Sequence, residues 1–176
     1  MSDIIVSSDN RVNPAVRSNH PIRTATKKGY YHIVEQLLQD PRVDASSYNN
    51  YCIQTSSERG FTKIVTILLK NPNVDPSVNS NYPIRYATLN GHTEIVKLLI
   101  NDKRVNPADN NNCALKWAVN NEFVKIVKLL LKDPRTDPNC VIRTVEKSEN
   151  IELVKIIKSD HRTGQPAKRQ RIVFDP

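Results

Sequence analysis

The feature that most restricts the fold of this chain is a repeat of 31 residues, which is marked by three of its four glycines, Gly29, Gly60 and Gly91. A period of roughly 20 to 50 residues is typical of a solenoid, in which each unit packs mainly on its neighbours. We therefore expect a single elongated array. The same step relates the aliphatic residues of four units: Ile22, Ile53, Ile84 and Leu115, followed by Val34, Val65, Val96 and Val127.

The third unit illustrates the expected local structure. Asn81 is placed to cap a short helix, and Pro83 fits its first turn, where a missing N–H costs nothing. Gly91 can end that helix in the left-handed conformation, and a second helix with aliphatic residues on one face begins near Thr93. Residues 109–112 form a polar turn that tolerates left-handed backbone. Each unit is thus predicted to be a helix, a tight turn, a second helix and an extended finger.

These motifs resemble the ankyrin repeat, whose pattern is visible in Tyr82-Pro83-Ile84-Arg85-Tyr86-Ala87, in Gly91-His92 and in the segment from Ile95 to Ile100. The resemblance covers roughly residues 9 to 158 and departs from the family in its period of 31 residues. It implies an all-α ankyrin-repeat solenoid with short β-turn fingers and no enzymatic activity. The connecting segment Asp133-Pro134-Arg135-Thr136-Asp137-Pro138 also resembles the ankyrin arrays of giant DNA viruses of amoebae, which would imply a viral protein acting on a host protein.

The repeat lattice also predicts the organisation of the chain. We expect an N-terminal partial or capping repeat in residues 1–18 and four repeats of 31 residues in residues 19–139. A shortened C-terminal capping repeat would follow in residues 140–158, and a basic tail in residues 159–176. The capping repeat has lost residues from its finger and is polar on its outer side, as the end of a solenoid requires.

In the ankyrin family, the concave surface of first helices and finger tips binds partner proteins, and its positions can be carried over to this sequence. They vary from unit to unit while the core positions hold. The surface is basic and rich in amides, so we expect an acidic or polar segment of a partner protein. The implied partner-binding residues are Lys27, Lys28, Tyr48, Asn50, Glu58, Arg59, Asn79, Leu89, Asn90, Asn110, Asn120 and Asn121.

Two further rows follow the repeat. The polar row Arg23, Gln54, Arg85 and Lys116 has two interpretations: a structural ladder to neighbouring acids or finger carbonyls, or a stripe that binds an acidic ligand. Aromatic residues stand in the adjacent row at Tyr86 and Trp117. We expect them to pack between repeats, since aromatics at helical spacing are usually core.

The sequence does not indicate an enzyme, because no nucleophile, general base or phosphate-binding loop occurs at the spacing that a catalytic motif requires. The four histidines and three cysteines show no metal-ligand pattern, so we expect no cofactor, no metal and no disulfide framework. No apolar run is long enough for a membrane span. The net charge of +8 leaves one alternative function, a nucleic-acid-associated protein that uses its basic tail and second-helix lysines. We consider that alternative less favourable than a protein partner.

The C-terminal tail carries Lys168, Arg169 and Arg171 in a short basic run that resembles a nuclear import signal. An unspecific basic tail is the competing interpretation. Together with the absence of a signal peptide, the sequence favours an intracellular protein, cytoplasmic or nuclear through this tail, and in the host cell if it is viral. We expect a monomer.

Overall fold

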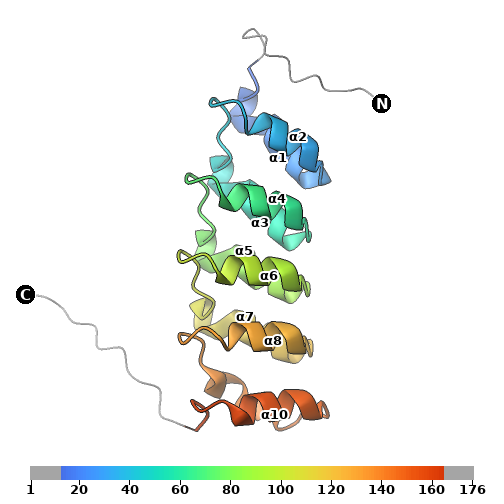
Figure 1. Ribbon diagram of the computed structural model, residues 1–176, viewed down its shortest axis with the longest axis vertical. Coiled ribbons are helices and arrows are strands. Elements are labelled where there is room, and N and C mark those ends of the chain that lie inside the picture. The colour runs from blue at the N-terminus through green and yellow to red at the C-terminus, as the bar shows by residue number, and fades with distance from the viewer. Residues whose placement is uncertain (1–12, 165–176) are drawn as a thin grey trace, which may run out of the picture.

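A computed structural model describes residues 13–164 as a column of helical hairpins (Figure 1). In each hairpin an inner helix is followed by a tight turn and an outer helix. The described residues contain helices and no strands, which confirms the predicted all-α solenoid. The inner helices are α1 (Val16–Lys28), α3 (Ser47–Glu58), α5 (Val78–Leu89) and α7 (Asp109–Asn120); the outer ones are α2 (Tyr31–Leu37), α4 (Thr62–Leu69), α6 (Thr93–Ile100) and α8 (Val124–Leu130). A fifth unit consists of η1 (Pro138–Val141), α9 (Ile142–Val145) and α10 (Ile151–Ser159).

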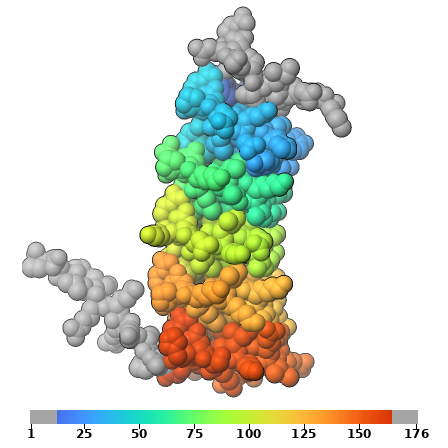
Figure 2. Space-filling model, viewed as in Figure 1, coloured from blue at the N-terminus to red at the C-terminus, as the bar shows by residue number. Residues whose placement is uncertain are grey.

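A single aliphatic seam runs through the stack. Val34, Val65, Val96 and Val127 on the outer helices are each 0% exposed and belong to one core cluster. Successive inner helices contact one another, as do successive outer helices, and Figure 2 shows the described units as one unbroken rod. Burying each such side chain contributes about 1.5–3 kcal/mol, so helices too short to persist alone are stabilised by their neighbours.

A left-handed turn precedes the right-handed part of every inner helix. In the second unit Tyr48, Asn49 and Asn50 have φ angles of 57°, 57° and 56°, and residues 110–112 adopt the same conformation, as predicted for that turn. The third residue of each turn is asparagine, which tolerates this region better than most residues. Its Oδ1 accepts a hydrogen bond from a backbone N–H of the next connecting segment. The pairs are Asn19–Asp44 (2.8 Å), Asn50–Asp75 (2.7 Å), Asn81–Asn106 (2.7 Å) and Asn112–Asp137 (2.9 Å).

Asn81 therefore has a different role from the one its sequence position suggested. We expected it to cap its own helix, but its Oδ1 instead accepts the N–H of Asn106 in the connecting segment that follows α6. Its Nδ2 donates to the carboxylate of Asp109 at 2.8 Å. The asparagine row thus ties each finger to the next and satisfies partly buried backbone donors.

An Asp-x-Arg motif forms a second ladder along the connecting segments. In Asp133-Pro134-Arg135 the two charged groups pair at 2.6 Å, and Arg135 also donates to the backbone carbonyl of Val105 in the preceding unit at 2.9 Å. Arg104 does the same towards Val74 at 2.6 Å. The ion pairs hold the pKa of Asp102, Asp133 and Asp160 below the ordinary carboxyl value, chiefly through hydrogen bonds from the paired arginines.

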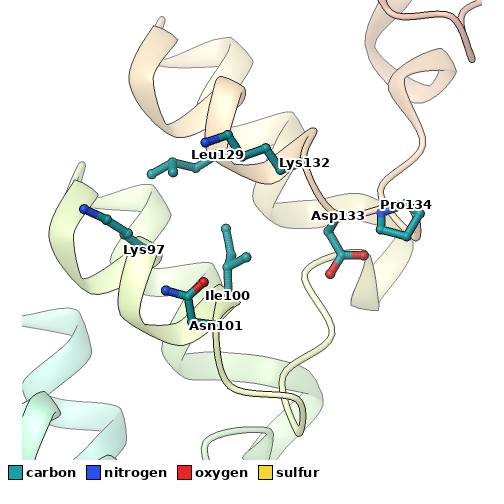
Figure 3. A pocket seen from close by; sticks show the side chains of 7 residues that line it. All are labelled: Lys97, Ile100, Asn101, Leu129, Lys132, Asp133 and Pro134. Atoms are coloured by element: carbon teal, nitrogen blue, oxygen red, sulfur yellow. The ribbon is translucent and has the colours of Figure 1, made fainter.

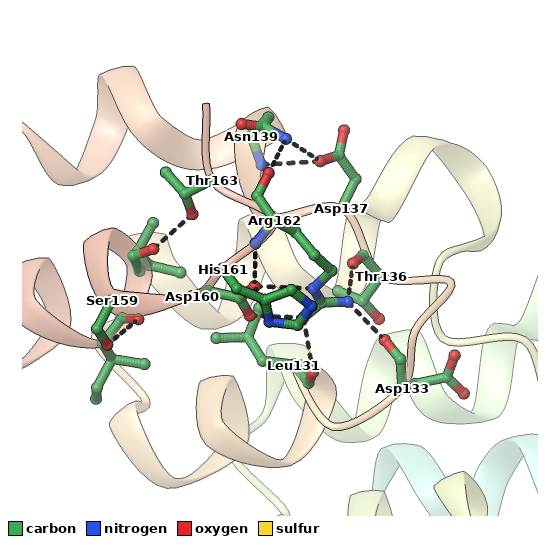
Figure 4. Close-up of polar contacts among 12 residues, drawn as sticks. Leu131, Asp133, Thr136, Asp137, Asn139, Ser159, Asp160, His161, Arg162 and Thr163 are labelled. Carbon is green, nitrogen blue, oxygen red and sulfur yellow. Dashed lines mark hydrogen bonds and ion pairs between the residues drawn. The ribbon is translucent and has the colours of Figure 1, made fainter. Parts of the chain in front are cut away.

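Arg162 closes the C-terminal end of the solenoid (Figure 4). Its guanidinium donates to the carbonyls of Leu131 (2.7 Å), Asp133 (3.1 Å) and Thr136 (2.8 Å) and pairs with Asp160 at 2.6 Å. The backbone N–H of Gly164 donates to Asn139 Oδ1 at 2.7 Å, which repeats the asparagine ladder.

Residues 159–164 are thus bonded into the array, although the sequence suggested that the tail begins at residue 159. The structure describes neither residues 1–12, which include most of the expected N-terminal cap, nor residues 165–176.

The hairpin turns close on glycines with left-handed backbone, as predicted for Gly91. Gly29, Gly60 and Gly91 have φ angles of 74°, 80° and 72°, and a ring from the next unit lies over each one. In the fourth unit this position is held by Glu122, with φ of 55°. There the ring is replaced by Asn150, which is the residue that precedes α10 and donates to Glu122 Oε2 at 3.2 Å.

Candidate functional site

The solvent side of the inner helices, together with the left-handed turns that precede them, forms what we call the inner-helix face. Most of the side chains carried over from the family surface are exposed here, with Tyr48 67% exposed, while Asn50 and Leu89 are half-buried. Equivalent positions differ in chemistry: Lys27, Glu58, Leu89 and Asn120 succeed one another at the repeat spacing. By contrast, the large buried position of the same helices is aliphatic in every unit, as Ile22, Ile53, Ile84 and Leu115.

Several of these side chains contact the preceding repeat. Arg59 Nη1 donates to the carbonyl of Lys27 at 3.3 Å, and Asn90 Nδ2 donates to the carbonyl of Glu58 at 3.0 Å. Asn79 donates to Gln54 Oε1 at 3.1 Å. These hydrogen bonds orient the exposed side chains, because each donates to a backbone carbonyl or to a side-chain amide oxygen of the neighbouring repeat. Among the predicted contact residues, Asn50 differs in that its Oδ1 accepts the backbone N–H of Asp75 and so belongs to the asparagine row.

Among the described residues, three of the four side chains in the polar row, Arg23, Gln54 and Arg85, donate to carbonyls of the left-handed turns and form no ion pair with the neighbouring acids. Arg23 Nε donates to the carbonyl of Ser18 at 3.1 Å, and Arg85 Nε donates to that of Ser80 at 2.8 Å. Gln54 Nε2 donates to the carbonyl of Asn49. Of the two partners we considered for a structural ladder, the carbonyls are therefore the ones used, and each bond lies within a single unit. The carbonyls are in reach because the left-handed turns direct them towards the helix.

A groove of about 840 Å³ lies between the first two units. Four of its nine lining residues are cationic, namely Arg23, Lys27, Lys28 and Arg59, and none is acidic. Aromatic rings also line the groove: Arg23 lies 6.0 Å from the ring centroid of Tyr51, and Lys28 Nζ lies 5.8 Å from that of Tyr30. The sequence indicated the cations but gave no sign that they share a groove.

Aromatic side chains gather further along the inner-helix face. Tyr82 and Tyr86 stack with ring centroids 3.9 Å apart, and Tyr86 meets Trp117 of the next unit edge-on at 5.6 Å. We expected Tyr86 and Trp117 to pack between repeats. They do contact each other across the repeat boundary, but both are only half-buried and keep a surface towards solvent. The Tyr82 hydroxyl donates to Glu58 at 3.0 Å; partial burial and this carboxylate raise the pKa of Tyr82 to about 12.

The outer helices present a different surface. A smaller depression of about 380 Å³ between α6 and α8 is lined by Ile100 and Leu129, with Lys97 and Lys132 at its rim (Figure 3). Lys128 nearby pairs with Glu152 at 2.7 Å. This surface combines lysines with two apolar side chains and has no aromatic cluster of the kind seen on the inner-helix face.

Searches of residues 13–164 for other kinds of site gave two results. No group of three or more histidine, cysteine or acidic side chains there is arranged to hold a metal ion. In the same range, no helix is both long and apolar enough to cross a membrane.

Stacked helical hairpins with a continuous exposed inner face define a helical-repeat solenoid. A family model described as ankyrin repeats in three copies matches residues 22–109 and again residues 50–142, which together span more than half of the chain. The chain therefore belongs to the ankyrin-repeat family. A search of curated proteins finds no match. Ankyrin repeats are generally protein–protein interaction modules, and proteins built from them are typically non-enzymatic scaffolds.

Proposed function

We propose that this chain is a non-enzymatic scaffold that holds a partner protein on its inner-helix face. One observation carries the proposal: a solvent-facing position of the inner helices changes chemistry from unit to unit, whereas the large buried position of the same helices stays aliphatic. Lys27, Glu58, Leu89 and Asn120 occupy one such position, while Ile22, Ile53, Ile84 and Leu115 occupy an equivalent core position. A solenoid presents such side chains in fixed order along an extended surface, which suits recognition of a protein segment.

The proposed contact residues are those predicted from the sequence, with Asn50 left out because its side-chain oxygen is bonded to Asp75. We further propose that the partner is a protein of a host cell, on the basis of the resemblance to viral ankyrin arrays.

The proposed import signal lies outside the described residues. Its test is a fluorescent reporter fused to residues 161–176, and a reporter without nuclear enrichment would remove it.

The scaffold proposal is tested by affinity capture from a cell lysate with three forms of the chain. The inner variant carries Asn90→Glu and Asn120→Glu, and the matched outer variant carries Gln36→Glu and Asn101→Glu. All four sites are exposed amides, so the charge added is the same. We expect a protein retained by the wild type and the outer variant to be depleted at least tenfold from the inner variant.

Equal retention by all three forms would contradict binding through this face. Nucleic acid recovered in place of protein, with steep salt dependence, would favour the nucleic-acid alternative instead. Thermal melts of the three forms establish that the substitutions leave the fold intact.

A further inference from the structure

We infer that the inner-helix face binds an extended protein segment with carboxylates at one end and an apolar or aromatic side chain further along. This rests on the proposed function and adds to it the chemistry and register of the partner. The acidic end would occupy the groove between the first two units, and the apolar side chain would pack on the Tyr82–Tyr86–Trp117 cluster.

The groove selects for carboxylates because its cations have no acidic partner within residues 13–164. Among the described residues, Arg23, Lys27, Lys28 and Arg59 form no ion pair. Arg23 is held in place by the carbonyls of Ser18 and Arg17 and by the Tyr48 ring. A guanidinium fixed by neutral groups keeps its full charge for a ligand, and a carboxylate can accept charge-assisted hydrogen bonds from it.

The aromatic cluster supplies the second contact. Tyr and Trp are the side chains that most often dominate binding energy at protein interfaces. Here the Tyr82 hydroxyl is already bonded to Glu58 and its ring stacks on Tyr86, so the rings are ordered before a partner arrives. An ordered ring loses little conformational entropy on binding.

The spacing of the two contacts sets the length of the segment. The groove lies at the boundary of the first and second units, and the cluster at the boundary of the third and fourth. Helices pack about 10 Å apart, so these boundaries are separated by about 20 Å. An extended chain advances about 3.3 Å per residue, which places the apolar side chain about six residues after the carboxylates.

The distribution of charge favours a protein over a nucleic acid. Beyond Arg59, the proposed contact positions on this face become Leu89, Asn90, Asn120 and Asn121, which carry no charge. The inner-helix cations that follow, Arg85 and Lys116, are half-buried. A nucleic acid strand carries one charge about every 3.4 Å, so most of its phosphates would meet a neutral surface. A segment that is acidic over only a few residues matches the face along its whole length.

The probe for this inference is a fluorescein-labelled peptide of twelve residues, with three glutamates at one end and a phenylalanine about six residues after them. Fluorescence anisotropy compares it with a peptide carrying glutamine for glutamate, a second carrying serine for phenylalanine, and a twelve-nucleotide single strand. We expect each peptide change to weaken binding to the wild type at least fivefold, and the oligonucleotide to bind more weakly than the acidic peptide.

The protein variants are Lys27→Glu with Lys28→Glu in the groove, and Lys97→Glu with Lys132→Glu as the control on the outer helices. The charge change is identical and all four lysines are exposed. We expect at least a tenfold loss of affinity for the acidic peptide in the groove variant and less than a twofold change in the control. Equal loss in both variants, indifference to the glutamates, or tighter oligonucleotide binding would overturn the inference. The capture experiment with Asn90 and Asn120 uses neutral positions, so it can still succeed if the acidic preference is absent.

Discussion

The substitution Gly60→Ala tests how the hairpin turns are built. Gly60 has φ of 80°, and a methyl group added there would lie 2.7 Å from His92 Cε1 in the next unit. The ring cannot move away without loss, because His92 Nε2 lies 3.0 Å from the carbonyl oxygen of Glu58, within hydrogen-bond distance. The substitution therefore combines backbone strain with a steric overlap across a repeat boundary.

The two contributions can be estimated separately. A left-handed backbone costs a residue with a β-carbon about 1–2 kcal/mol relative to glycine. Overpacking against a fixed neighbour adds about 1–3 kcal/mol, so we expect Gly60→Ala to lower the free energy of unfolding by about 2–5 kcal/mol in all. At Gly91 the added methyl would lie 3.1 Å from Phe123 Cζ, so Gly91→Ala should cost little beyond the strain, about 1–2 kcal/mol.

Urea denaturation followed by circular dichroism measures these differences, and thermal melts should shift by about 2–4 °C for each kcal/mol. The double variant Gly60→Ala with His92→Ala removes the overlap and should show a favourable coupling energy. Glu122→Gly is the reverse experiment, because it relieves the strain at φ of 55° where no ring lies over the turn. A gain of about 0.5–1 kcal/mol is expected after loss of the Asn150 bond. Equal effects of Gly60→Ala and Gly91→Ala, or destabilisation by Glu122→Gly, would refute the reasoning.

Three further predictions concern the ladders. Arg162→Gln should destabilise the chain by about 2–3 kcal/mol through lost charged hydrogen bonds, whereas the exposed Arg143→Gln should have little effect in the same urea titration. Asn71→Asp with Asn73→Arg should restore the missing Asp-x-Arg step of the second unit and raise stability by about 1 kcal/mol; an unchanged midpoint would contradict this. The pKa of Asp133 is lowered from 3.8 in the folded state, so its contribution is present at neutral pH and is lost as the pH falls below that value. Asp133→Asn should therefore unfold more easily at pH 7 and show a shallower acid dependence of stability, and an unaltered pH profile would count against the ion pair.

The elements of this fold were predictable because each depends on a local signal repeated in register. The left-handed Gly91, the polar turn of residues 110–112 and the buried valine seam follow from residue type and helical period. The signal for the asparagine ladder was also present, since Asn19, Asn50, Asn81 and Asn112 stand at the repeat spacing. Spacing alone could not show that the left-handed turn directs Oδ1 towards the following connecting segment, so Asn81 was interpreted as a cap.

The candidate site was less predictable, because its properties depend on distances between units. Sequence position placed Tyr86 and Trp117 beside the core but could not determine how much of each ring faces solvent. The sequence left both acids and finger carbonyls open as partners for Arg23, and the backbone turn is what brings the carbonyl of Ser18 within hydrogen-bond distance. The groove of about 840 Å³ depends on how α1 packs on α3, which no single repeat encodes.

The inner-helix face can vary because the contacts that hold the units together are made mainly by other positions of each repeat. The valine seam, the asparagine bonds and the Asp-x-Arg bonds join neighbouring units through the core and the connecting segments. Positions such as Leu89 and Asn120 contribute to none of these ladders. A change there alters what the rod presents without loosening one unit from the next, and the period keeps successive side chains about 10 Å apart. A partner is thus distinguished by the order of the chemical groups along the rod, which is why the cationic groove and the aromatic cluster must be tested as a spaced pair.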